Sequence, residues 1–179
     1  MDNNLAVVYL GVLLALLAGV GLFVFRQVFR TRRLETTFSD LQKKLTKQKG
    51  TAQEYYALGG IYLNKKLYVQ AIAMFQKALK AVEQEETDNQ VNIALIYNGL
   101  GFGYFAQDQY DLAIRNYKEA LQIDPNYVKA LNNLAHAYEK KNLTDLALET
   151  YEQVLQSEPQ NNTAKRRAES LRKRVVASG

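Results

Sequence analysis

The first feature of the chain is an uncharged apolar run, LAVVYLGVLLALLAGVGLFVF, which covers residues 5–25. As an α-helix this run would be roughly 31 Å long, which matches the hydrocarbon core of a bilayer. A cleaved signal peptide would need positive charge ahead of the run, but the charged side chain found there is Asp2. The pattern therefore predicts an N-terminal tail and a retained transmembrane helix within residues 1–25.

Positive side chains follow the apolar run, in a helical segment over residues 26–51 that we interpret as a basic linker. By the positive-inside rule, the rest of the chain is expected on the cytoplasmic side, or in the stroma of a plastid. Apolar residues recur in this linker at spacings of four, three and four, at Leu34, Phe38, Leu41 and Leu45. We expect this seam to pack on the first repeat, with dimerisation as the alternative because the seam is short for a coiled coil.

Small residues lie four apart within the apolar run, at Gly11, Ala15 and Gly19. On a helix they share one face and would let another membrane helix approach closely. The alternative is that glycine and alanine are simply common in membrane spans. The spacing indicates a candidate membrane-helix contact.

Beyond residue 51, apolar and small residues recur with a period of 34. One copy has Leu100-Gly101-x-x-Tyr104 with Ala113, Tyr117, Ala120 and Pro125, and the next has Leu134-Ala135-x-x-Tyr138 with Ala147, Tyr151, Val154 and Pro159. An earlier copy, offset by 42, has Leu58-Gly59-x-x-Tyr62 with Ala71, Phe75 and Ala78. This spacing is identified as the tetratricopeptide-repeat (TPR) pattern, with Tyr55, Tyr97 and Leu131 at its leading position.

The pattern predicts an all-α protein, in which the transmembrane helix precedes a TPR solenoid of three helix pairs and a C-terminal capping helix. Asp124 before Pro125, and Asn142 with Asp145, are expected to cap helix starts. The expected segments are repeat 1 at 52–85, an acidic insertion at 86–93, repeat 2 at 94–127, repeat 3 at 128–161, and a basic capping helix and tail at 162–179.

The net charge of +5 is unevenly distributed. Residues 26–50 carry +6 and residues 162–179 carry +5, whereas residues 51–161 carry −5. Nucleic-acid proteins more often carry their basic charge along the body that binds, so nucleic acid is not an expected partner. The acidic stretch around residues 85–92 is interpreted as a solvated loop, with a basic partner segment as the alternative.

Composition argues against an enzyme. The chain has no cysteine and one histidine, His136. A thiolate metal site, a disulfide framework and a cysteine nucleophile are therefore excluded. Gly99, Gly101 and Gly103 lack the spacing of a dinucleotide-binding turn. We predict no catalytic residue, no cofactor and no metal site.

In a TPR solenoid the first helix of each pair lines the concave face, where we place recognition of protein partners. Aromatic rings there would give contact area to an extended peptide, and asparagine amides could bind its backbone. The candidate groove residues are Tyr56, Asn98, Gly99, Phe102, Phe105, Lys129, Asn132, Asn133, His136 and Lys140.

Two further expectations concern this groove. In the TPRs that bind a C-terminal carboxylate, lysine and asparagine occupy positions that correspond here to Tyr56, Gly60, Gly99, Lys129 and Asn133. Only Lys129 fits the pattern, so such a carboxylate clamp is not expected. Gly99 is expected to clear room for a ligand. Gly99→Leu should therefore weaken partner binding without unfolding the domain.

The uncharged span, the run FRQVFRTRRLETTFSDLQKKL and the three repeats together resemble the photosystem I assembly TPR family of cyanobacteria and plastids. The resemblance covers essentially the whole chain. It implies a thylakoid membrane protein whose repeats face the cytoplasm or stroma, hold photosystem I subunits or assembly intermediates, and perform no chemistry. The alternative function is a general membrane-bound TPR adaptor in protein quality control or secretion.

Overall fold

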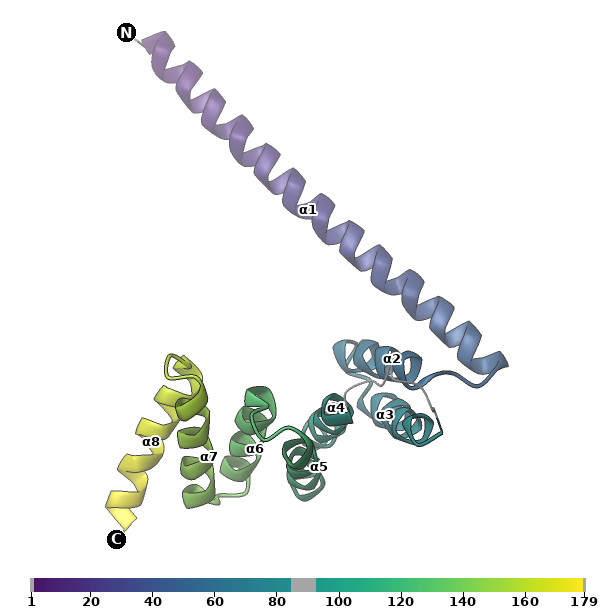
Figure 1. Ribbon diagram of the computed structural model, residues 1–179. Coiled ribbons are helices and arrows are strands. Elements are labelled where there is room, and N and C mark those ends of the chain that lie inside the picture. The colour runs from purple at the N-terminus through teal and green to yellow at the C-terminus, as the bar shows by residue number, and fades with distance from the viewer. Residues whose placement is uncertain (1, 85–92, 179) are drawn as a thin grey trace. The chain divides into compact units, whose positions relative to one another are not determined.

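The computed structural model describes residues 2–84 and 93–178. The expected acidic insertion therefore lies almost entirely outside the described residues. Within them the structure is helical and holds no strand, as expected from the sequence. The helices are α1 (Asp2–Lys47), α2 (Ala52–Asn64), α3 (Tyr68–Val82), α4 (Ile93–Phe105), α5 (Tyr110–Ile123), α6 (Val128–Lys140), α7 (Thr144–Ser157) and α8 (Asn162–Ser178) (Figure 1).

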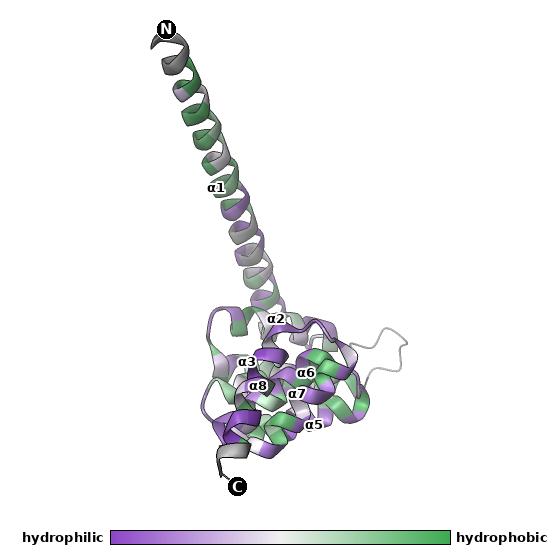
Figure 2. Ribbon diagram, turned by 90° about the vertical axis from the view of Figure 1, so that its left-hand side faces the viewer, coloured by the Kyte–Doolittle hydropathy of each residue, from purple (hydrophilic) through white to green (hydrophobic). Residues whose placement is uncertain are grey.

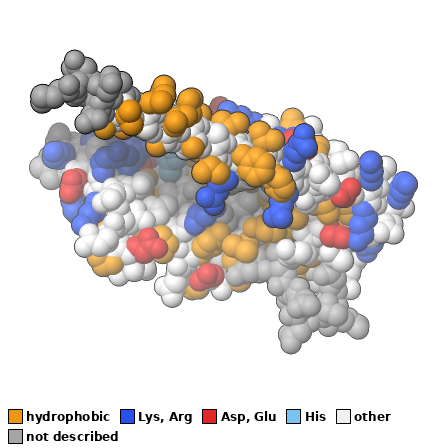
Figure 3. Space-filling view, turned by 90° about the horizontal axis from the view of Figure 1, so that it is seen from above, with side chains coloured by type: hydrophobic (Ala, Val, Ile, Leu, Met, Phe, Trp, Pro, Cys, Tyr) orange, Lys and Arg blue, Asp and Glu red, His pale blue; other side chains and the backbone are white. Residues whose placement is uncertain are grey.

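Helix α1 forms one compact unit, and residues 48–179 form the other. Among the described residues, one stretch of α1, Val7–Phe29, is long and apolar enough to cross a membrane. Figure 2 shows this hydrophobic stretch giving way to a hydrophilic one along the helix, and hydrophobic side chains gather along it in Figure 3. The basic linker continues the same helix to Lys47.

The seam residues Phe38, Leu41 and Leu45 are half-buried. The side chain of Leu34, the fourth member of the predicted seam, lies outside the described residues. Packing of the seam on the repeats, or against a second copy, stays a prediction.

The second unit is a solenoid of three helix pairs, α2–α3, α4–α5 and α6–α7, followed by α8 (Figure 1). From α2 to α8, consecutive helices pack against each other. Helical pairs of this kind cannot bury their apolar faces alone, so stacking of neighbours creates the core. The predicted all-α solenoid with a final capping helix is confirmed.

The turn inside each pair contains one residue with a left-handed backbone, in the same repeat position. These residues are Lys66, Asp108 and Asn142, with φ of 60°, 58° and 58°. The residue after each donates its backbone N–H to a carbonyl five residues earlier, for example Leu67 to Tyr62. Asparagine and aspartate tolerate this conformation better than other non-glycine residues. Lys66 is therefore the least suited of the three residues to its left-handed backbone.

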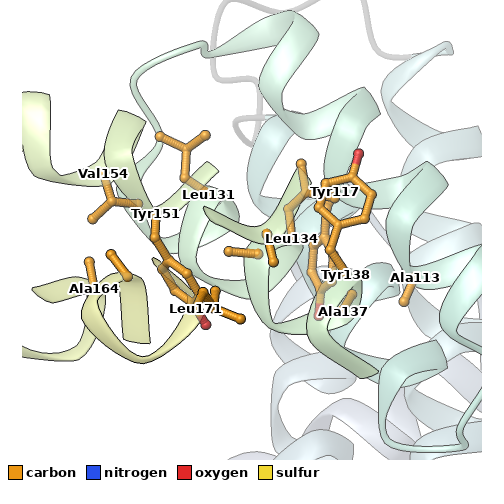
Figure 4. Packing of buried hydrophobic residues seen from close by; sticks show 13 residues of the cluster. Ala113, Tyr117, Leu131, Leu134, Ala137, Tyr138, Tyr151, Val154, Ala164 and Leu171 are labelled. Carbon is orange, nitrogen blue, oxygen red and sulfur yellow. The ribbon is translucent and has the colours of Figure 1, made fainter. Parts of the chain in front are cut away.

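Aromatic side chains of the second helices fill the interior against small residues. Tyr117 and Tyr151 are almost fully buried, and so is Phe75. Figure 4 shows Tyr151 near Ala164 and Leu171 of α8, which are buried with it in one cluster. The largest buried side chains thus occur once per repeat and join each pair to the helix that follows.

The predicted side-chain caps are wrong, because the helices begin elsewhere. Helix α6 follows Tyr127, which makes no side-chain cap bond, and Asp124 instead accepts a hydrogen bond from the backbone of Asn126 at 3.1 Å. Helix α7 likewise follows Leu143 without a side-chain cap. A capping box that was not predicted begins α2, where the side chains of Thr51 and Glu54 accept hydrogen bonds from each other's backbone N–H groups.

Helix α8 closes the solenoid through both apolar and ionic contacts. Ala164, Ala168 and Leu171 are buried against α7. The carboxylate of Glu139, on α6, accepts a hydrogen bond from the Tyr151 hydroxyl at 2.8 Å and pairs with Arg167 of α8 at 3.2 Å. Three consecutive helices are therefore joined at one largely buried carboxylate.

Candidate functional site

The concave side of the three repeats contains an open cavity of about 680 Å³. Residues of α2, α4 and α6 line it, together with Lys66 in the turn after α2, Tyr68 and Phe75 of α3, and Tyr127 just before α6. Concave, mostly apolar sites with a few polar groups are typical of binding sites. We call this cavity the groove.

Six of the residues predicted for the concave face line the groove, from three different helices. They are Tyr56, Asn98, Gly99, Phe102, Lys129 and Asn133. They occupy the same side of α2, α4 and α6 because the first helices of successive repeats lie side by side, so equivalent positions meet. Whether a partner binds these residues stays a prediction.

Two of the predicted amides bond each other rather than standing apart. The side-chain nitrogen of Asn133 donates to the side-chain oxygen of Asn98 at 2.9 Å, which joins α6 to α4. Asn98 is buried at 6% exposure, yet it lines the groove. This hydrogen bond holds the two amide groups in a fixed orientation at the groove wall.

Two tyrosines give the groove neutral phenol groups. Burial raises the pKa of Tyr56 above its ordinary value. Burial also raises the pKa of Tyr127, with smaller contributions from Tyr56 and from the carboxylate of Asp124. Both phenols therefore stay protonated near neutral pH, where each can donate a hydrogen bond.

The other four predicted residues do not line the groove. Phe105 packs on the imidazole of His136 with ring centroids 4.8 Å apart, and on Tyr110 at 5.3 Å. Asn132 donates to the carbonyl of Val128 at 3.1 Å, while its own side-chain oxygen is buried without a partner in the described structure. Lys140 is exposed near the end of α6.

The surroundings of His136 favour its neutral form. Burial lowers its pKa, and the charges of Arg167 and Lys140 lower it further, while Glu139 acts in the opposite direction. Its position beside Phe105 is therefore that of a packed ring rather than of a charged contact.

The expectation for Gly99 is wrong in one respect. A Cβ atom at this position would lie 2.7 Å from Cζ of Phe75, so the glycine is needed for packing of α4 on α3. Substitution by leucine would disturb the fold as well as the groove.

Gly60 is the glycine that opens the groove, and the sequence reasoning did not assign it this role. A Cβ atom on Gly60 would meet nothing within 4 Å, and the residue lines the groove. The repeat register contained the signal, because the equivalent positions hold Phe102 and His136. Lys66 and Tyr127 also line the groove and were missed, since they lie outside the first helices.

Comparison with known proteins identifies the family. Two tetratricopeptide-repeat family profiles match this chain, at residues 51–126 and 104–169. The uncharacterized protein ycf37 of Cyanophora paradoxa is 37% identical over 130 residues, which are 73% of this chain and 73% of that protein. The chain belongs to the ycf37 family of TPR proteins. Its repeats therefore belong to a class whose members serve as protein-interaction scaffolds.

A chloroplast relative matches nearly the whole of this chain. The tetratricopeptide repeat domain-containing protein PYG7 of Arabidopsis thaliana, described as chloroplastic, is 37% identical over 168 residues. The alignment covers 93% of this chain and 54% of the relative. Because so little of this chain lies outside the alignment, it has to include most of the candidate span.

A solved structure shows the same fold. The first TPR of Spaghetti (RPAP3), bound to the HSP90 peptide SRMEEVD, superposes with a TM-score of 0.63 at 19% identity. The superposition covers 72% of this chain and 96% of that one. At this level of identity the likeness supports the fold of the repeats and not a shared ligand.

The described residues hold no group of three or more histidine, cysteine, aspartate or glutamate side chains that could bind a metal ion. The groove itself is lined by aromatic, aliphatic, amide and lysine side chains. This arrangement is suited to holding another chain by contact area and hydrogen bonds.

Proposed function

We propose that this protein is a membrane-anchored TPR scaffold that binds protein partners in its groove and assists the assembly or stability of photosystem I. The partners would be photosystem I subunits or assembly intermediates, and the protein would lie in the thylakoid membrane. The observation that carries the proposal is the alignment with the chloroplast relative, because it joins the candidate span and the repeats in one shared chain.

The distribution of charge supports anchoring with the repeats on the cytoplasmic or stromal side. Arg32 and Arg33 are exposed just beyond the candidate span Val7–Phe29, and Arg26 lies near its end. Basic residues beside a span favour the cytoplasmic or stromal side of the membrane. Each can also be attracted to anionic headgroups, with a binding free energy of about 1 kcal/mol.

The anchor itself offers a candidate contact for other membrane helices. Gly11, Ala15 and Gly19 are exposed on α1, and a Cβ atom on either glycine would meet nothing within 4 Å. A partner helix could therefore approach the backbone closely along this face.

The test is mass spectrometry of proteins that copurify with the tagged full-length chain after gentle solubilisation of its native membranes. A version that lacks residues 1–25 is purified in parallel. We expect photosystem I subunits with the full-length chain, and their retention without the anchor would support recognition by the repeats.

Recovery of chaperones, proteases or translocon components alone would contradict the photosynthetic assignment. The general adaptor in quality control or secretion would then replace it.

A further inference from the structure

We propose that the groove binds an extended acidic segment of a partner protein, and that a bulky apolar or aromatic side chain of this segment enters the space left open by Gly60. The inference rests on the proposed function in taking a protein segment as the occupant. It adds the chemistry of that segment and the position of its anchor residue.

The space at Gly60 is a local departure from the repeat pattern. Repeats 2 and 3 carry Phe102 and His136 at the equivalent position, whereas repeat 1 carries no side chain there. A Cβ atom on Gly60 would meet open space, although the residue is half-buried and lines the groove. Glycine within a helix costs about 0.5–1 kcal/mol relative to alanine, and no packing contact of this residue explains that cost.

The surroundings of this space are aromatic. Tyr56, Tyr68 and Tyr127 line the groove with Phe102, which is 42% exposed. Rings of this kind give large contact areas to an inserted apolar side chain, and such buried anchors dominate binding energies. An apolar or aromatic anchor residue therefore fits the open position.

The positive charge of the groove favours acidic residues on either side of the anchor residue in the bound segment. Two lysines, Lys66 and Lys129, are among the described residues that line it, and none of these is acidic. In the described part of the chain neither lysine has an ion-pair partner, whereas Lys141, Arg167 and Arg172 do. The surrounding body, residues 51–161, carries −5 overall, so the groove is a locally basic site on an acidic domain and complements an acidic segment.

The amide pair indicates how the backbone of such a segment would be held. The side-chain nitrogen of Asn133 donates one of its two hydrogens to the side-chain oxygen of Asn98. In the described structure the side-chain nitrogen of Asn98 has no hydrogen-bond partner. Side-chain amides placed in this way can hydrogen-bond the carbonyl groups of an extended chain. The arrangement would hold the segment while Gly60 and the lysines select its side chains.

The probe is a phage-displayed library of short random peptides, selected on the full-length protein in lipid nanodiscs. We expect the enriched peptides to carry Phe, Trp, Tyr or Leu beside Asp or Glu. A synthetic copy with alanine at the anchor should bind the unaltered protein at least about tenfold more weakly. Enrichment of basic or uncharged peptides, equal binding of the alanine copy, or no enrichment at all would each overturn the proposal.

Two sets of variants locate the binding. Gly60→Phe introduces the residue that repeat 2 carries at this position and should weaken binding of the enriched peptide at least about tenfold. Gly60→Ala leaves most of the space open and should therefore weaken binding less. Lys66→Asn with Lys129→Gln should abolish the preference for acidic residues, and Lys66→Asn introduces the residue found in the equivalent turn of repeat 3. Lys173→Glu on α8 is the matched charge control outside the groove and should change nothing.

The unfolding temperature of each variant separates loss of binding from loss of structure. Unchanged affinity in a folded Gly60→Phe protein would contradict the proposed anchor position. The outcome is also separable from that of the copurification experiment. Photosystem I subunits recovered with a protein that selects basic peptides would remove this inference alone, and acidic selection without those subunits would remove the photosynthetic function alone.

Discussion

The ring of Phe75 lies so close to Gly99 that a Cβ atom placed on this glycine would be 2.7 Å from the ring's Cζ atom. The same ring approaches the corresponding point on Gly59 to 2.8 Å. Phe75 on α3 is thus held between the helix before it and the helix after it. This contact makes two glycines of the solenoid structural, while Gly60, next in sequence to Gly59, is free to shape the groove.

Alanine substitutions should separate these two kinds of glycine. Gly99→Ala is expected to lower the free energy of unfolding by about 1–3 kcal/mol, because the added methyl group collides with the Phe75 ring. Gly60→Ala should raise it by up to about 1 kcal/mol, because alanine favours the helix and meets open space. Denaturant unfolding of the full chain in detergent, followed by circular dichroism, measures both. Equal effects at the two positions would contradict this assignment.

The bond between Tyr151 and Glu139 should contribute measurably to stability. Tyr151→Phe removes the donor that holds the Glu139 carboxylate at 2.8 Å, with an expected loss of about 1.5 kcal/mol in the free energy of unfolding. Tyr117→Phe is the matched control, since Tyr117 occupies the same position one repeat earlier and its hydroxyl has no hydrogen bond in the described structure. Equal losses from the two substitutions would show that the bond contributes nothing specific.

The single histidine should make stability depend on pH in a defined direction. Burial and the nearby Arg167 lower the pKa of His136 in the folded protein below its ordinary value of 6.5. The unfolded chain therefore binds a proton more readily, so stability from this group is complete above pH 6.5 and declines as the pH falls through and below that value.

His136→Gln should reduce this decline. The measurement compares unfolding temperatures of the two proteins from neutral pH to mildly acidic pH, because carboxylates contribute equally to both. Identical slopes would show that the histidine has the same proton affinity in the folded and unfolded chains.

The candidate span should be necessary for membrane association. Leu14→Arg with Leu17→Arg places two charges inside Val7–Phe29, at a cost of about 2.5–3.5 kcal/mol each near the centre of a bilayer. We expect this variant to leave the membrane fraction on alkaline washing, whereas the unaltered chain remains in it. Val69→Arg with Leu112→Arg, at exposed positions of the repeats, is the matched control and should stay in the membrane fraction. Retention of the span variant would contradict insertion of this segment.

The repeats and the apolar stretch could be predicted from the sequence because both depend on spacing along the chain. Ala71, Ala113 and Ala147 recur in register with the aromatic residues, and all three are fully buried. The face that each first helix turns toward the groove follows from the same periodicity, which is why Tyr56, Asn98 and Asn133 were predicted to share one surface.

The starts of the helices could not be predicted in the same way. Asp124 and Asn142 are residues that favour caps, but the structure uses them in turns instead. Helices α6 and α7 begin without side-chain caps because packing of their apolar faces stabilises them more than local capping does.

The sequence by itself therefore determined the helical repeats, the candidate membrane span and the side of each helix that lines the concave face, since all three are properties of periodicity and composition. Only the tertiary structure decided that Gly99 is a packing residue, that the space beside Gly60 is left empty by its neighbours, and that Glu139 joins three helices. These roles depend on how closely a neighbouring helix approaches and on which side chain occupies the space between. Spacing within one helix carries no information about that distance.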